Sequence, residues 1–183
     1  MSDDVLAPPT GARLDLLKQL GFADLEHDSH VPFISHLVGT RRVLAQWGER
    51  PAVCDAGLFH SAYGTEYFPV DQDVDRSQVQ AVIGEEAEAI AHAWCTIRRD
   101  TIELGDAGAP ATVIDRTTDQ RIDLTDDQLA DIATLWAADT VEQVHRMTPE
   151  ERAFATNLAR VVHLARPAAR AAVEATLADL AQG

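Results

Sequence analysis

Apolar residues recur at helical intervals along most of the chain, which is the spacing of one buried helix face. Glycines after the last apolar turn and prolines in first-turn positions separate these stretches from one another. The pattern predicts an all-α fold of about eight helices, covering residues 12–20, 35–47, 51–62, 76–83, 85–98, 126–146, 148–165 and 167–180. The exception is 112–124, where two short β-favouring runs flank a polar turn and predict one small β-hairpin.

Capping residues define three of these boundaries. Ser35 is placed to cap the second helix, and Thr125 and Thr148 each open a capping box. Between the helices, no stretch has the composition of a linker that would divide the chain. We therefore expect a flexible N-terminal tail over residues 1–11 and a single helical domain over residues 12–183, which ends in a C-terminal helical pair over residues 148–181.

Length and charge narrow the functional classes. The chain of 183 residues is long enough for one domain with a core of its own. Its 30 acidic and 15 basic residues give a net charge of −15, which repels nucleic acids and anionic membrane surfaces. We expect neither as a partner. A small anionic substrate stays compatible with this charge, because a bound metal ion reverses the local field.

The two cysteines and the N-terminus point to a cytoplasmic protein. Cys54 and Cys95 lie in apolar runs without metal-binding spacing, which is typical of buried free thiols in a reducing compartment. The first residues are acidic and include no apolar stretch of the kind found in secretory signals.

Three polar residues in otherwise apolar helices are candidates for chemistry. His36, His60 and Asp139 fall on three separate predicted helices. Asp139 lies beside an apolar stripe, where a buried carboxylate needs a partner. Two imidazoles and one carboxylate form a common metal-ligand set. Spacing alone also allows three unrelated polar residues.

The order of these residues resembles a known superfamily. The segments are 36–40 (HLVGT), 53–61 (VCDAGLFHS), 79–87 (VQAVIGEEA) and 135–139 (LWAAD). Together they resemble the H…HD…D pattern of the HD superfamily of metal-dependent phosphohydrolases, and are closest in style to the hydrolase domain of the stringent-response (p)ppGpp enzymes. The combined string HLVGT…AGLFHSAYGTE is also similar to a set of uncharacterised bacterial and fungal proteins.

This resemblance implies a fold, a site and a reaction. The fold would be an HD-like helical core over residues 30–145. The site would be formed by His36, His60 and Asp139, and would hold one divalent metal ion (Mn, Fe or Zn). The reaction would be hydrolysis of a small phosphorylated or nucleotide-like molecule, and the chain would be an HD-type metal-dependent hydrolase.

One departure from the superfamily pattern affects the metal count. Where the superfamily has an aspartate after its second histidine, this chain has Ser61. That aspartate is a metal ligand in the superfamily and often bridges two metals, whereas serine is a poor ligand for a divalent cation. We therefore expect at most one metal, with a water molecule or Glu66 as the fourth ligand.

Catalytic roles can be proposed for three residues near the second histidine. Glu66 is a candidate general base for a metal-bound water, although a solvated loop glutamate is the plainer interpretation. Tyr63 could donate to a substrate oxygen, or belong to the core. Ser61 could be a nucleophile, but neighbouring helix residues point about 100° apart, so His60 is badly placed to serve as its base.

Substrate-binding candidates lie around the first histidine. His30 enters this region from a loop, and Arg41 and Arg42 follow on the predicted helix, where they could bind a phosphate or form surface ion pairs. Gly39 lies in the middle of that helix, which indicates close packing against another helix.

Two other functions remain open from the sequence. Two histidines and one aspartate also match the ligand count of non-haem iron oxygenases, and some HD-superfamily members are di-iron oxygenases. Alternatively, Ser61 indicates a chain that has lost its metal and serves as a binding or interaction protein. The Ala-rich final helices could then form a homodimer face.

Overall fold

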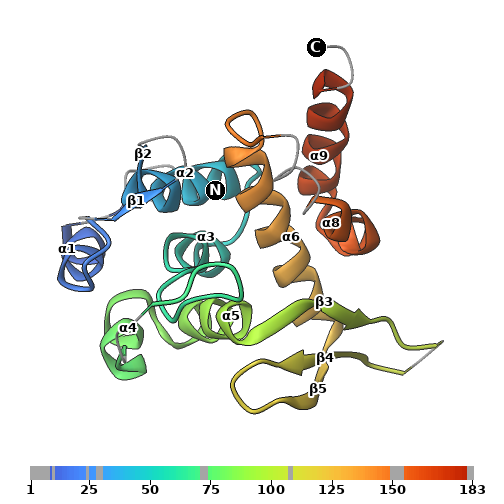
Figure 1. The fold of residues 1–183 in the computed structure, drawn as a ribbon, viewed down its shortest axis with the longest axis horizontal. Helices are drawn as coiled ribbons and strands as arrows, with labels where there is room; N and C mark the ends of the chain where they lie inside the picture. Colours follow the sequence, from blue (N-terminus) through green and yellow to red (C-terminus); the bar gives the residue numbers. More distant parts are fainter. Residues whose placement is uncertain are drawn as a thin grey trace.

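The structure is a computed structural model that describes residues 9, 11–23, 25–27, 31–70, 74–106, 109–148 and 155–180. Within these ranges the chain is mostly helical, with eight α-helices, one three-stranded antiparallel sheet and a two-stranded pairing of β1 with β2 (Figure 1). In the same ranges, no helix combines the length and apolar character needed to cross a bilayer.

The elements follow one another in a simple order. They are α1 (Gly11–Gln19), β1 (Glu26–His27), β2 (Val31–Pro32), α2 (Phe33–Gln46), α3 (Pro51–Leu58), α4 (Arg76–Ile83), α5 (Glu85–Thr96), β3 (Ile97–Glu103), β4 (Ala111–Asp115), β5 (Gln120–Leu124), α6 (Asp126–Gln143), α8 (Ala155–Val161), a 3-10 turn (Val162–Leu164) and α9 (Pro167–Leu180).

Several local signals have the predicted effect. The Thr125 hydroxyl accepts from the Gln128 amide, and the Gln128 side chain accepts from the Thr125 amide, so the predicted capping box opens α6. Pro51 lies in the first turn of α3. The predicted hairpin is β4 paired with β5. The box at Thr148 and the tail over 1–11 rest largely on residues 149–154, 1–8 and 10, which lie outside the described residues.

The start of α2 differs from the prediction. The helix begins at Phe33, its N-cap position is Pro32, and Ser35 lies inside the helix rather than at its cap. The Phe33 amide donates to the Leu25 carbonyl, and the Phe33 ring is buried and stacks on Phe68 at a centroid distance of 4.4 Å. Burial of this ring fixes the entry of the chain into α2, and a serine cap is not needed.

The end of α5 also differs. The helix stops at Thr96 rather than near Arg98, and Ile97–Glu103 forms β3, which pairs with β4 and turns the predicted hairpin into a three-stranded sheet. Ile97, Arg99 and Ile102 are buried along this strand. Because an arginine occupies one of the buried positions, the strand has no clean apolar alternation in the sequence.

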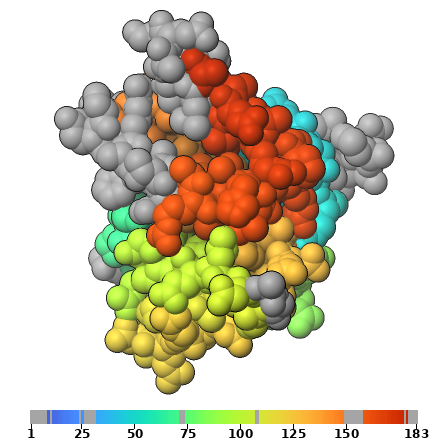
Figure 2. Space-filling model, turned by 90° about the vertical axis from the view of Figure 1, so that its right-hand side faces the viewer, coloured from blue at the N-terminus to red at the C-terminus, as the bar shows by residue number. Residues whose placement is uncertain are grey.

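Helix α6 is the central element of the molecule. It runs between α2 and α3 on one side and α8 and α9 on the other (Figure 1), and it packs against all four. Leu135, Ala137 and Ala138 of α6 belong to one core cluster together with Leu158 of α8 and Val173 of α9. Figure 2 shows the C-terminal helices on one face, directly above the sheet. A polar residue on the opposite side of α6 therefore faces α2 and α3.

Candidate metal centre

Three helical segments bring two imidazoles and a carboxylate together. His36 lies on α2, His60 lies two residues past the end of α3, and Asp139 lies on α6. The His36 Nε2 atom is 3.2 Å from His60 Nε2 and 3.1 Å from Asp139 Oδ1, and His60 Nε2 is 3.3 Å from the same oxygen. Among the described residues this group could hold a metal ion. The convergence predicted from the sequence is confirmed.

The close approach of α2 and α3 places the two imidazoles side by side. Gly57 of α3 lies against α2, where an added Cβ would be 2.4 Å from the Leu44 Cδ1 atom. A side chain at position 57 would force Leu44 to move, so glycine favours this close approach. His36 and His60 are then 2 % and 3 % exposed, so both ligating nitrogens are withdrawn from bulk water.

The proton on His60 is fixed by a backbone carbonyl. Its Nδ1 atom lies 2.6 Å from the Gly57 carbonyl oxygen, which can only accept a hydrogen bond. The Nδ1–H must therefore donate there, and in the neutral imidazole the lone pair is on Nε2, which faces Asp139. A ligating histidine in proteins is held in this way.

The proton on His36 is fixed by a carboxylate. Its Nδ1 atom lies 2.6 Å from Glu142 Oε2, which also accepts from Arg146 Nη2 at 2.7 Å. Burial alone would raise the pKa of Glu142, but the hydrogen bonds from His36 and Arg146 outweigh burial and lower it. The charged Glu142 accepts the Nδ1–H, so that in a neutral His36 the Nε2 lone pair also faces the centre.

The centre therefore needs a positive charge. Two imidazole lone pairs and one carboxylate oxygen lie within 3.3 Å of each other, and all three are hydrogen-bond acceptors when the histidines are neutral. Burial opposes a charged His36, but Asp139 and Glu142 outweigh it and raise the pKa of His36 to about 9. Burial would raise the pKa of Asp139, but the two imidazoles hold it well below its usual range. A proton on His36 supplies this charge.

The spacing also suits a metal ion. Ligand atoms bound at 2.0–2.1 Å in a tetrahedral site lie about 3.3 Å apart. The three distances in the centre are 3.1, 3.2 and 3.3 Å, so the side chains already form one face of such a site. The Asp139 side chain is 18 % exposed, and it is the most exposed of the three.

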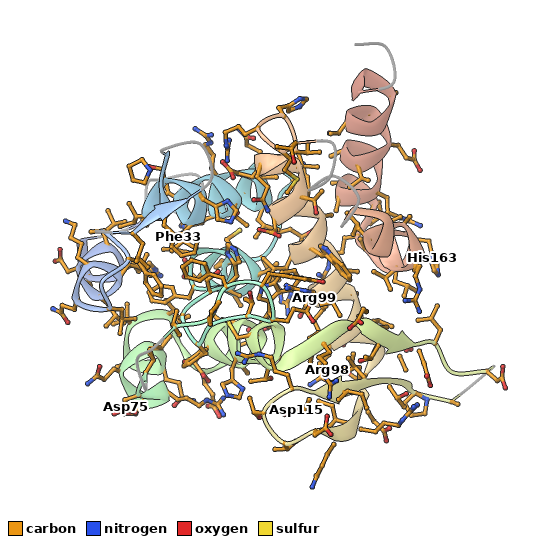
Figure 3. The ribbon with its side chains drawn as sticks, viewed as in Figure 1. Phe33, Asp75, Arg98, Arg99, Asp115 and His163 are labelled. Carbon is orange, nitrogen blue, oxygen red and sulfur yellow. The ribbon has the colours of Figure 1, made fainter. Side chains whose placement is uncertain are left out.

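The structure places the predicted catalytic residues outside this cluster. The Glu66 carboxylate accepts from Arg99 Nε at 2.8 Å, and the Arg99 guanidinium lies over the Trp94 ring at 4.1 Å. Figure 3 shows Arg99 in the interior, beside α6. The Tyr63 hydroxyl donates to Glu88 at 2.8 Å. Ser61 is buried directly after His60. Both Glu66 and Tyr63 thus have structural partners of their own.

Two of the predicted substrate-binding residues, Arg41 and Arg42, have different surroundings. Arg41 is buried and its Nε atom donates to Asp55 at 3.3 Å, so it belongs to the packing of α2 on α3. Arg42 is exposed and lines a cavity of about 530 Å³ together with Lys18 and Glu142. His30 lies outside the described residues.

Glu142 is the part of the centre that the sequence analysis missed. It lies three residues after Asp139 and therefore on the same face of α6. That spacing was the available signal. Gly39, for which we predicted close packing against another helix, faces Glu142 on α6.

Comparison with known proteins adds one finding. Residues 16–99 match the family model of a domain of unknown function (DUF6817). This stretch includes both histidines and ends before Asp139. No curated protein and no solved structure matches the chain.

Proposed function

We propose that this chain is a metal-dependent hydrolase that acts on a small phosphorylated or nucleotide-like molecule. His36, His60 and Asp139 would hold one divalent metal ion. The observation that carries the proposal is the arrangement of the two imidazoles: each Nδ1 atom lies against an oxygen acceptor, and both Nε2 atoms lie within 3.3 Å of Asp139 Oδ1. When bound, the ion would lower the pKa of a water molecule and offset negative charge on a phosphoryl group.

The residues of this chain have distinct roles in the proposal. The buried imidazoles hold their lone pairs in place without reorganisation, which is the main contribution of a protein to metal chemistry. Asp139 supplies the negative charge that favours a cation, and its exposed edge is where a substrate would enter. Arg42 and Lys18, near Glu142, are the basic side chains that could attract an anionic substrate toward this part of the surface.

The order of the ligands supports an HD-like interpretation of the helical core. The histidines come from two consecutive helical segments and the aspartate from a later long helix, in the order in which the superfamily places them. Ser61 in place of the usual aspartate supports a centre with a single metal. The Glu66 carboxylate is paired with Arg99, so the metal would have three protein ligands. Its remaining coordination positions would be open to water and substrate.

Metal analysis of the purified protein tests this proposal most directly. We expect close to one equivalent of Mn, Fe or Zn per chain, and loss of that metal in the Asp139→Asn variant, which keeps the shape of the side chain and removes its charge. Metal-dependent release of phosphate or nucleoside products from a panel of nucleotides and phosphate esters tests the reaction. A folded protein without metal would support a binding or interaction protein instead.

A second candidate function is favoured by the facial arrangement of the ligands. Two histidines and one carboxylate on one face, with the remaining positions open, are also the ligand set of non-haem Fe(II) oxygenases. Loading the protein with Fe(II) under anaerobic conditions and then admitting oxygen separates the two candidates. An oxygen-dependent change in the absorption spectrum favours the oxygenase, and an unchanged spectrum favours the hydrolase.

A further inference from the structure

We propose that Glu142 is a positioning residue of the metal centre, and that Gly39 is a glycine because Glu142 needs the space. The proposal rests on metal binding by His36, His60 and Asp139 and not on the reaction that follows. Glu142 would hold His36 in the one protonation and orientation that can ligate, without touching the metal itself.

The contacts of Glu142 fit this role. Its Oε2 atom lies between two donors, His36 Nδ1 at 2.6 Å and Arg146 Nη2 at 2.7 Å. The Glu142 side chain is 9 % exposed, and the Arg146 side chain that anchors it is 33 % exposed. The Glu142 carboxylate therefore contacts His36 at Nδ1, the ring nitrogen that faces away from Asp139, and Arg146 holds the carboxylate in place.

Gly39 provides the room for this carboxylate. A Cβ at position 39 would lie 2.6 Å from Glu142 Oε1, 2.8 Å from its Cγ and 2.9 Å from its Cδ. Atoms do not approach so closely, so any side chain here would push Glu142 away from His36. Gly39 lies three residues after His36 on α2, on the same face of the helix. Glycine is disfavoured inside a helix, and this contact gives a reason for its presence.

The chemical consequence concerns the tautomer of His36. A neutral imidazole with no acceptor at Nδ1 can carry its proton on either nitrogen. With the proton on Nε2, the atom that faces His60 and Asp139 cannot bind a metal ion. An acceptor oxygen of Glu142 at 2.6 Å favours the proton on Nδ1 and leaves Nε2 free to ligate. His60 needs no such side chain, since the Gly57 carbonyl does the same for it.

Zinc affinity measured by competition with a chromophoric chelator tests the proposal. Loss of an outer partner of a histidine ligand weakens metal binding by about 10- to 100-fold. We expect this loss in Glu142→Ala. Glu142→Gln keeps an acceptor for Nδ1–H without the charge, so we expect it to recover a large part of the affinity. Glu174→Ala, which removes an exposed carboxylate on α9, serves as the matched control and should leave the affinity unchanged.

A double-mutant cycle tests the role assigned to Gly39. Gly39→Ala should weaken zinc binding as much as Glu142→Ala does, because it displaces the same carboxylate. In the Glu142→Ala background, the methyl group added at position 39 has no Glu142 side chain to displace. The zinc affinity of the Gly39→Ala/Glu142→Ala double variant should therefore equal that of Glu142→Ala. Gly11→Ala, where an added Cβ meets only one atom at 3.9 Å, controls for glycine replacement in a helix.

Two readouts separate positioning from a purely structural role. Circular dichroism and the melting temperature of the metal-free variants report folding. The ¹⁵N shifts of His36 in the zinc-loaded protein report which nitrogen carries the proton, and in the wild-type chain this should be Nδ1. Unchanged zinc affinity in a folded Glu142→Ala variant, or additive effects in the cycle, would overturn the proposal while leaving the metal site intact. A wild-type chain that binds zinc but hydrolyses nothing would overturn only the proposed reaction.

Discussion

At the scale of single residues, each proposed ligand is held by a second residue. His60 donates to the Gly57 carbonyl, His36 donates to Glu142, and Asp139 Oδ1 accepts from Gln143 Nε2 at 3.2 Å. Side chains that are fixed before a ligand arrives lose little conformational freedom on binding. The centre is thus prepared for a cation by hydrogen bonds that do not involve the cation.

Ser61 gives a prediction at this scale. Ser61→Asp adds a carboxylate directly after His60, at the position where the HD superfamily has a metal ligand. We expect this variant to bind more metal or to bind it more tightly, and Mn²⁺ to raise its melting temperature more than that of the wild-type chain. Without metal the variant should be less stable, by about 1–3 kcal/mol, because the added charge is buried.

Metal content and melting temperature, with and without Mn²⁺, measure both effects of Ser61→Asp. Ser61→Asn is the control, since it has nearly the same shape and no charge. The alternative interpretation is that the Ser61 hydroxyl only satisfies a nearby backbone carbonyl. In that case Ser61→Asp lowers the melting temperature under both conditions and binds no additional metal.

At the scale of elements, helices could be predicted where the apolar period was regular, but some boundaries differ: α2 begins at Phe33, α3 ends at Leu58 rather than at residue 62, and α5 ends at Thr96. Helices α4 and α9 have the predicted limits to within a residue, because Gly84 and Pro167 mark them. Strand β3 could not be predicted, since the buried Arg99 owes its burial to Glu66, which is 33 residues away, as well as to the Trp94 ring. Phe33 displaced the predicted cap at Ser35 through contacts with Phe68 that are equally remote.

The candidate site could also be predicted only in part. The three candidate ligands could be predicted because their order along the chain resembles a known pattern. The spacing of Glu142 from Asp139 places it near the site, but its contact with His36 could not be predicted, because it depends on the crossing of α2 and α6, which brings residues 106 positions apart within 2.6 Å. Tyr63 and Glu66 were assigned catalytic roles from their nearness to His60 in sequence, and in the folded chain they contact Glu88 and Arg99.

Helices α4 and α5 are joined by a carboxylate that is fully buried. Glu88 accepts hydrogen bonds from Arg76 at 2.6 and 2.8 Å, from Gln80 at 2.9 Å and from the Tyr63 hydroxyl at 2.8 Å. Burial would raise the pKa of Glu88, but these hydrogen bonds outweigh it and lower the pKa below its ordinary value of 4.5. A charged Glu88 therefore stabilises the fold.

The pH dependence of this contribution gives a prediction at the element scale. A carboxylate whose pKa is lower in the folded state stabilises the protein above its unfolded pKa and loses that effect as the pH falls through the folded pKa. At pH 7 we expect Glu88→Gln to lower the free energy of unfolding by about 2 kcal/mol, because donors from Arg76 and Gln80 lose a charged acceptor. Below pH 4 the difference between the two proteins should shrink.

Urea unfolding at pH 7, 5 and 3.5 measures this difference. Glu174→Gln on α9 removes an exposed carboxylate and should have no comparable effect at any pH. If the difference between wild type and Glu88→Gln stays constant down to pH 3.5, the contribution comes from packing and not from the charge of Glu88.

At the scale of the whole molecule, the candidate metal centre joins parts of the chain that are distant in sequence. Both histidines lie within the stretch that matches DUF6817, and Asp139 lies on α6 beyond it. Helix α6 also carries the core that α8 and α9 cover, so its position depends on the C-terminal helices. The site is therefore complete only when α2, the end of α3 and α6 are all packed, and an unfolded chain has no such arrangement of ligands.

A metal ion that binds only the folded chain must raise the stability of the folded chain. At a free metal concentration 100 times the dissociation constant, the stabilisation is about 2.7 kcal/mol. For a chain of 183 residues this raises the melting temperature by roughly 5–10 °C. Zn²⁺ or Mn²⁺ added to the chelator-treated protein should therefore produce such a shift in the wild-type chain and none in Asp139→Asn. The shift should saturate at one equivalent, because Ser61 leaves no carboxylate to bridge a second ion. Equal shifts in both proteins would mean that the metal binds elsewhere on this acidic surface, and saturation at two equivalents would contradict a centre with a single ion.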